Sequence, residues 1–226
     1  MPRHPQIYIV RHGETEWSKS GQHTGDTDLE LTPNGKHQAR TLSYYVFENP
    51  SQGYVEHQHI GQIYVSPLKR AQETLDCLHF EKKHELTPIV DKDLMEWHYG
   101  DYEGKTTAEI HQTQPGWNIF DDGCPNATER ADRVIQAVRA FHNHCAKTSE
   151  DATKAAREDP NSDVLIVAHS HFLRVFVARW LDLDPIQGKY IILDTAGISI
   201  LGYEHNLDEP VIRAMNVTSK LFNILA

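Results

Sequence analysis

The sequence predicts an α/β protein with a mostly parallel central sheet. Short apolar runs rich in β-branched residues alternate along its 226 residues with segments of helical periodicity, the pattern of strands joined by helical crossovers. No composition shift marks a linker, and no segment repeats. The chain is long enough for one sizeable core, so we expect a single domain over residues 1–226.

The first half contains two predicted strands, each followed by a helix. Residues 6–10 are a buried strand that stops at Arg11-His12-Gly13, and residues 62–65 are a second. A helix is expected from Thr32-Pro33 to Phe47, because proline fits the first helical turn. Ser66 is expected to cap a helix that runs to about His79.

The second half contains the clearest strand, residues 163–168, and a helix expected from Phe172 to Leu181. Residues 190–193, 197–203 and 211–215 resemble strands, which we expect to add antiparallel edges to the sheet.

Two further segments stand outside this alternation. Residues 127 to about 157 are helical in pattern, and their polar part, within residues 146–162, is expected to be a solvated helix end or loop. Residues 96–127 are punctuated by Gly, Pro and Trp. We expect them to form an excursion that caps the domain.

Composition excludes several classes of protein. Ten more acidic than basic residues give a formal charge of −10, which disfavours nucleic acid as a partner. No apolar run approaches the ~20 residues needed to cross a membrane, and the N-terminus lacks the apolar core of a signal peptide. Three cysteines without C-x-x-C spacing argue against disulfides or structural zinc. We therefore expect a cytoplasmic protein; association into a homo-oligomer remains open.

Polar residues follow three of the predicted strands. Arg11 and His12 end the first, Ser66 leads to Arg70 after the second, and His169 follows the strand at 163–168. The carboxyl ends of parallel strands meet at one edge, where free backbone N–H groups favour anions. Two guanidinium and two imidazole groups suit a phosphoryl group. The alternative is that each Arg pairs with a carboxylate and each His merely packs.

Glu96 is the fifth candidate. Its apolar and aromatic neighbours, Met95 and Trp97 among them, are expected to raise the pKa of its carboxyl by desolvation and let it hold a proton. The alternative is an ordinary pair with an arginine.

Four blocks of sequence occur in the order typical of one family. The blocks are Arg11–Trp17 (RHGETEW), Ser66–Thr74 (SPLKRAQET), Glu96–Gly104 (EWHYGDYEG) and Ala168–Arg174 (AHSHFLR). Over residues 7 to about 205, the chain resembles the histidine phosphatase superfamily, in its phosphoglycerate mutase-like branch. The resemblance implies a three-layer α/β/α sandwich and chemistry through a phosphohistidine.

The resemblance also implies roles for the five candidates. His12 would be the nucleophile, with Nδ1–H donating to a backbone carbonyl. Arg11, Arg70 and His169 would hold the phosphoryl oxygens. Glu96 would protonate the leaving oxygen and then activate water. No metal or cofactor is required, and the partner is a small phosphorylated metabolite.

Three departures from the mutases favour hydrolysis, the transfer of the phosphoryl group to water, over its return to the substrate. Ser18 stands where mutases carry Asn, Thr107 stands where they carry a substrate-gripping Lys, and their Arg-Arg pair is missing. Further blocks, including Trp117-Asn118-Ile119, resemble the fungal sedoheptulose-1,7-bisphosphatase subgroup, although Ser170 replaces its usual Gly. A sugar bisphosphate is therefore the expected substrate. Broad phosphomonoesterase activity and mutase activity stay open.

Other residues are assigned by position in the motifs. Those expected to bind substrate are Ser18, Thr24, Gly25, Tyr99, Ser170, Arg174 and His205. His171 and the His-x-His pairs at 57–59 and 142–144 are expected to be ordinary surface residues. Two rival classes remain: a metallohydrolase with His12, His169, His171 and Glu96 as ligands, and a non-catalytic phosphosugar or phosphoprotein sensor.

Overall fold

The computed structural model describes residues 3–48, 55–121, 124, 126–150 and 161–218. Its strands are β1 (Ile7–Arg11), β2 (Ile60–Val65), β3 (Ile89–Val90), β4 (Asp163–Ala168), β5 (Ile198–Tyr203) and β6 (Pro210–Val217). Its α-helices are α1 (Glu16–Ser20), α2 (Pro33–Ser43), α3 (Lys69–Cys77), α4 (Thr107–Thr113), α5 (Ala127–Glu150) and α6 (Ser170–Trp180). A π-helix continues α2 over Tyr44–Glu48.

The strands form one sheet in the order β3-β2-β4-β1-β5-β6. β1, β2, β3 and β4 run parallel, with Tyr8 paired to Leu165 and Tyr64 to Ile166. β5 and β6 join antiparallel beside β1. A mostly parallel sheet with antiparallel edge strands was the sequence prediction, and it is confirmed.

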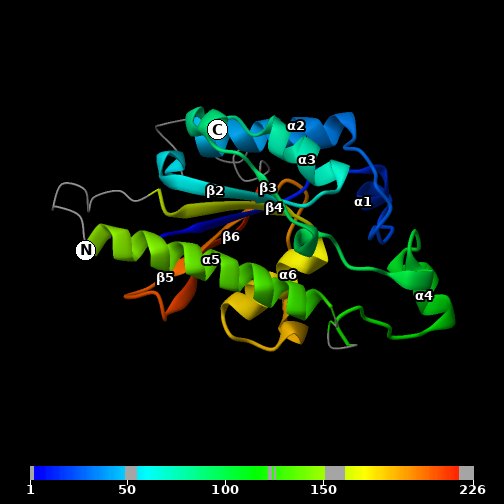
Figure 1. The fold of residues 1–226 in the computed structure, drawn as a ribbon. Coiled ribbons are helices and arrows are strands. Elements are labelled where there is room, and N and C mark those ends of the chain that lie inside the picture. The colour runs from blue at the N-terminus through cyan, green and yellow to red at the C-terminus, as the bar shows by residue number, and fades with distance from the viewer. Residues whose placement is uncertain (1–2, 49–54, 122–123, 125, 151–160, 219–226) are drawn as a thin grey trace.

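Helices cover both faces of the sheet (Figure 1). α2 and α3 lie on one face and α5 and α6 on the other. Alternate residues of β1 enter the two cores: Tyr8 and Val10 pack on the side of α2 and α3, whereas Ile7 and Ile9 pack on the side of α5 and α6. The three-layer α/β/α fold class is confirmed.

Three local predictions are wrong or incomplete. Ser66 is not the cap of α3, because the cap position belongs to Leu68 and the Ser66 hydroxyl contacts His169 instead. Residues 190–193 are no strand: a 3-10 helix over Pro185–Tyr190 passes into irregular chain. The short β3, α1 and α4 were not predicted. Of the polar segment within 146–162, residues 151–160 lie outside the described chain.

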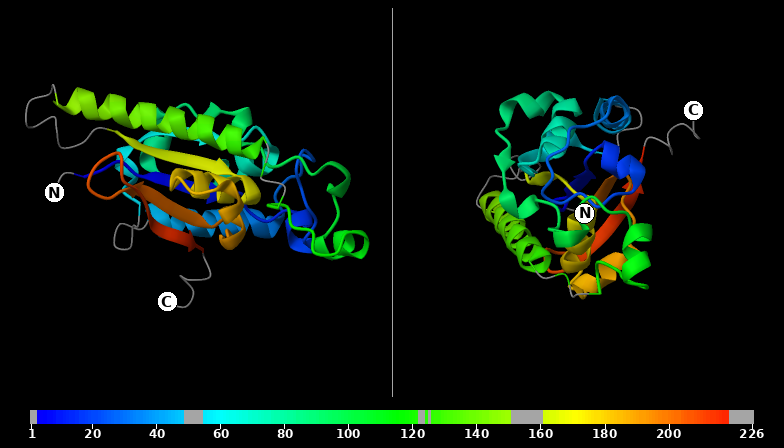
Figure 2. Two further views of the ribbon diagram at one scale, coloured as in Figure 1. Left: turned by 90° about the horizontal axis from the view of Figure 1, so that it is seen from below. Right: turned by 90° about the vertical axis from the view of Figure 1, so that its right-hand side faces the viewer.

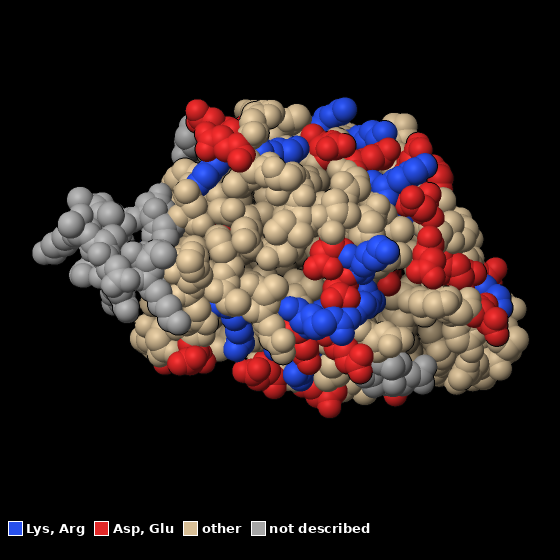
Figure 3. Space-filling view, viewed as in Figure 1, with Lys and Arg blue, Asp and Glu red and all other residues tan. Residues whose placement is uncertain are grey.

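The parallel strands point their carboxyl ends toward one end of the molecule. α1 and α4 lie beyond that end, with α4 reaching farthest from the sheet (Figure 2). On the face that carries α5, Lys and Arg side chains are interspersed with Asp and Glu (Figure 3). Within the described ranges, no helix is both long and apolar enough to cross a membrane.

Candidate active site

His12 lies at the carboxyl end of β1 and is only 5% exposed. Its Nδ1 is 2.7 Å from the Gly13 carbonyl oxygen. A carbonyl can only accept, so Nδ1 carries the proton and Nε2 keeps a free lone pair. Burial, and then the charges of Arg70 and Arg11, lower the pKa of His12 well below its usual value. The ring is therefore neutral near pH 7.

Arg70 and His169 contact one another beside His12. Arg70 is fully buried in α3, and its Nε donates to His169 Nδ1 over 3.1 Å. His169 Nε2 then carries a proton and donates to the Ser66 hydroxyl over 2.7 Å. The rings of His12 and His169 lie 5.2 Å apart, centre to centre. Burial, and then the Arg70 charge, lower the pKa of His169 well below normal.

Thr24 and Gly25 hold Arg70 through their backbones. The Arg70 guanidinium donates to the Thr24 and Gly25 carbonyls at 3.2 and 2.9 Å, and to the Thr27 carbonyl at 2.9 Å. The Gly25 N–H donates to the Glu103 carboxylate. A Cβ at Gly25 would lie 2.3 Å from the Trp97 carbonyl oxygen, so the close approach requires glycine. These backbone contacts hold the Arg70 guanidinium in place.

Arg11 reaches the same place from the end of β1. One terminal nitrogen donates to the Leu193 carbonyl over 2.6 Å. Its Nε is buried and has no hydrogen-bond partner in the described part of the chain. A buried donor without a partner is costly unless a ligand supplies the acceptor.

Glu96 sits at the N-terminus of α6 and is 6% exposed. Its Oε1 accepts the backbone N–H groups of Trp97 and Phe172 at 3.0 and 2.9 Å. Among the described residues, its Oε2 accepts a hydrogen bond only from the His171 N–H, at 3.0 Å. Oε2 is therefore the oxygen with room for a proton. No arginine side chain makes an ion pair with it among the described residues.

A cavity of about 280 Å³ opens in front of Arg11, His12 and Glu96, whereas the fully buried Arg70 and His169 are not among the residues that line it. Its wall includes Arg11, His12 and Glu96, and it is called the His12 cavity below. Four of the predicted substrate-binding residues line it: Ser18, Thr24, Tyr99 and Ser170. The Ser18 hydroxyl also belongs to the capping box of α1, where it bonds to the backbone of Thr15.

A second, smaller cavity adjoins the first. This side cavity measures about 180 Å³ and is lined by Trp117, Phe120 and Arg174 among others. His23, Thr107 and His171 line both cavities, which therefore adjoin one another along these side chains. Arg174 lies 4.5 Å above the Phe120 ring and donates to the carbonyls of Gly188 and Lys189.

His171 and His23 were not predicted as site residues. His171 was expected on the surface, but its side chain is only 18% exposed and its Nδ1 is 2.6 Å from the Tyr99 hydroxyl. The His23 ring lies 4.9 Å from that of Tyr99 and 5.3 Å from that of Trp117. The available signal for His171 was its place inside the Ala168–Arg174 block, and for His23 its place next to Thr24, which was expected to bind substrate.

His205 is not part of the site. β5 runs antiparallel to β1, with Leu201 opposite Ile7, so the loop after β5 lies at the amino end of β1, away from His12. There the His205 ring is exposed and donates to Glu209 over 2.6 Å.

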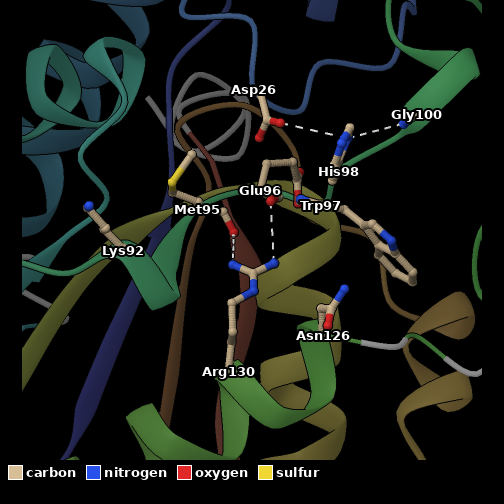
Figure 4. A pocket seen from close by; sticks show the side chains of 9 residues that line it. All are labelled: Asp26, Lys92, Met95, Glu96, Trp97, His98, Gly100, Asn126 and Arg130. Atoms are coloured by element: carbon tan, nitrogen blue, oxygen red, sulfur yellow. Dashed lines mark hydrogen bonds and ion pairs between the residues drawn. The ribbon is translucent and has the colours of Figure 1, made fainter.

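Glu96 also borders a third space, on the side of α5 (Figure 4). This rear cavity measures about 390 Å³ and is lined by Lys92, Asn126 and Arg130 among others. The Arg130 guanidinium bonds to the backbone carbonyls of Met95 and Glu96, which fixes the segment that carries Glu96.

The metallohydrolase alternative requires a group of metal-ligating side chains, and the described part of the chain contains none. No group of three or more His, Cys, Asp or Glu residues there is arranged to hold a metal ion. Both ring nitrogens of His169 are hydrogen-bonded, one to Arg70 and one to Ser66. Nδ1 of His171 is hydrogen-bonded to the Tyr99 hydroxyl.

The fold and this cluster define an α/β protein that gathers two arginines, two histidines and a glutamate near the carboxyl ends of its parallel strands. A family model described as the histidine phosphatase superfamily, branch 1, matches residues 7–218. The chain belongs to this family, and the prediction of a phosphoric monoester hydrolase is confirmed.

Similar proteins include named phosphatases. The chain is 35% identical to the sedoheptulose 1,7-bisphosphatase of Saccharomyces cerevisiae, over 92% of this chain and 91% of that one. It is 32% identical to an acid phosphatase of Mycobacterium tuberculosis, covering 91% and 90%. The solved structure of an open reading frame product from M. tuberculosis superposes with a TM-score of 0.69 and 29% identity, covering 96% and 100%.

Proposed function

We propose that the protein is a metal-independent phosphatase that hydrolyses a small phosphorylated metabolite through a phosphohistidine on His12. The observation that carries the proposal is the bond from His12 Nδ1 to the Gly13 carbonyl, 2.7 Å long. It leaves Nε2 unprotonated on a neutral, buried ring. A fixed, unprotonated nitrogen is what in-line attack on phosphorus needs.

In the first step, the Nε2 lone pair of His12 forms a bond to phosphorus while the ester P–O bond breaks. Glu96 gives its Oε2 proton to the departing oxygen, and the alcohol leaves. In the second step, Glu96 takes a proton from water, the water oxygen bonds to phosphorus and the P–N bond breaks. Inorganic phosphate is released and His12 is restored.

Arg11 and Arg70 supply the electrostatic part of this proposal, and His169 joins them once its Nε2–H turns from the Ser66 hydroxyl to a phosphoryl oxygen. They stabilise the charge on the phosphoryl oxygens in a largely desolvated site, where fixed donors count most. The buried Arg11 Nε, without a partner in the described chain, is one donor for a phosphoryl oxygen. Arg70 is fixed by carbonyls, so it need not reorganise during the reaction.

We extend the proposal to a sugar bisphosphate such as sedoheptulose 1,7-bisphosphate. The two adjoining cavities support it, and so does the similarity to a named sedoheptulose 1,7-bisphosphatase. Arg174 in the side cavity would bind the distal phosphate. We further propose that residues 1–226 form one domain whose 96–127 segment caps the site.

The test measures phosphate release from sedoheptulose 1,7-bisphosphate, fructose 1,6-bisphosphate, sugar monophosphates and 3-phosphoglycerate, with and without a chelator. We expect the highest kcat/KM on a bisphosphate, unaffected by the chelator. His12→Asn should lose at least about 10³-fold, as nucleophile removal does in other enzymes, whereas the exposed His98→Asn should stay within about twofold. Isomerised phosphoglycerate without phosphate release would favour a mutase instead.

A further inference from the structure

His171 lines both the His12 cavity and the side cavity and contacts the proposed proton donor. Its backbone N–H bonds to Glu96 Oε2 over 3.0 Å, and its ring Nδ1 lies 4.0 Å from the same oxygen. The alcohol that Glu96 is proposed to protonate must therefore lie close to this imidazole.

The Tyr99 hydroxyl fixes the state of the His171 ring. Burial, and then the Glu96 charge, raise the pKa of Tyr99 well above normal, so the phenol keeps its proton. We assign the phenol as the donor in its 2.6 Å contact with His171 Nδ1. Burial, and then the Arg174 charge, lower the pKa of His171 well below normal. A neutral ring that accepts at Nδ1 must carry its own proton on Nε2.

The same ring is held in place by its aromatic neighbours. Its centre lies 5.5 Å from that of Phe120, 5.9 Å from that of Tyr99 and 5.9 Å from that of His23. Nε2 has no hydrogen-bond partner among the described residues and is not among their buried unsatisfied atoms. The ring thus presents one preoriented N–H donor to the space that would hold the organic part of the substrate.

We propose that His171, oriented by Tyr99, donates its Nε2–H to a hydroxyl or carbonyl oxygen of the substrate and so selects sugar phosphates over deoxygenated phosphate esters. The inference rests on the proposed phosphatase function and adds a specificity-determining residue to it. The donor acts on the carbon chain rather than on phosphorus, so its loss should depend on the substrate.

The test compares fructose 1,6-bisphosphate with hexane-1,6-diol bisphosphate. The diol ester has the same number of carbon atoms but no hydroxyl or carbonyl group on its carbon chain. In His171→Phe we expect kcat/KM to fall about tenfold on the sugar, the value of one hydrogen bond, and less than about threefold on the diol ester. The loss should appear mainly in KM. The exposed His84→Phe is the control and should change neither value.

Tyr99→Phe gives a second variant that removes only the hydroxyl. We expect it to weaken the sugar preference in the same direction, because Nδ1 is then free to take the proton from Nε2. Equal losses on both esters in His171→Phe, or an unchanged sugar preference in both variants, would overturn the role of His171. The proposed phosphatase function would still stand. A wild-type enzyme that hydrolyses neither ester would overturn the proposed function, and this inference with it.

Discussion

His142 gives the stability of the protein a pH dependence that can be calculated. It lies in α5, is 1% exposed, and has Nδ1 2.9 Å from the Tyr203 hydroxyl. Burial, and then the Arg139 charge, lower its pKa from 6.5 to about 3. The folded protein thus keeps His142 neutral where the unfolded chain would protonate it.

The unfolded state binds more protons than the folded state between pH 6.5 and about 3, so stability rises with pH across that window. At about 1.4 kcal/mol per pH unit, His142 alone removes about 3 kcal/mol of unfolding free energy between pH 7 and pH 4. The loss approaches its limit of about 5 kcal/mol only below pH 3.

Urea unfolding at pH 7 and pH 4 measures this quantity. In His142→Gln, the difference between the two unfolding free energies should shrink by about 3 kcal/mol relative to wild type. His144→Gln, two residues along the same helix and exposed, should leave that difference within about 0.5 kcal/mol. An equal pH dependence in wild type and His142→Gln would refute the reasoning.

Other predictions concern the support of the site. Gly25→Ala should lower kcat/KM at least about 100-fold, because its Cβ collides with the Trp97 carbonyl and displaces the loop that holds Arg70; unchanged kinetics would contradict this. Glu103→Gln replaces the carboxylate that accepts the Gly25 N–H by an amide and should lower kcat/KM about tenfold. An unchanged kcat/KM would show that Glu103 is not needed to hold Arg70 in place. Glu96→Gln should slow alkyl phosphates at least about 100-fold more than p-nitrophenyl phosphate, and equal losses would exclude its acid role.

The sequence predicts the sheet and the residues around phosphorus because both follow from strand ends. Arg11 and His169 follow buried parallel strands, so topology alone brings them together. Ser66 shows where local rules fail: its hydroxyl could cap a helix, but the tertiary contact with His169 takes it instead. His205 was assigned by its position in the motifs, although the antiparallel direction expected for residues 197–203 already places the end of that strand at the opposite edge of the sheet from His12.

The residues that line the side cavity were harder to predict than those around His12. Trp117 and Phe120 lie in the irregular chain after α4, whose path depends on packing rather than on periodicity. His23 and His171 matter through their contacts with the 96–127 segment, for example the ring of Tyr99. No spacing in the sequence encodes those contacts.

Rapid-quench analysis of the enzyme during turnover tests the central proposal most directly. A labelled bisphosphate should give a phosphoenzyme that is stable in base and labile in acid, with the phosphoryl group on Nε2 of His12. Its formation should be as fast as product release, and His12→Asn should give none. Turnover at the wild-type rate in His12→Asn, or a phosphoryl group mapped to another residue, would contradict the account.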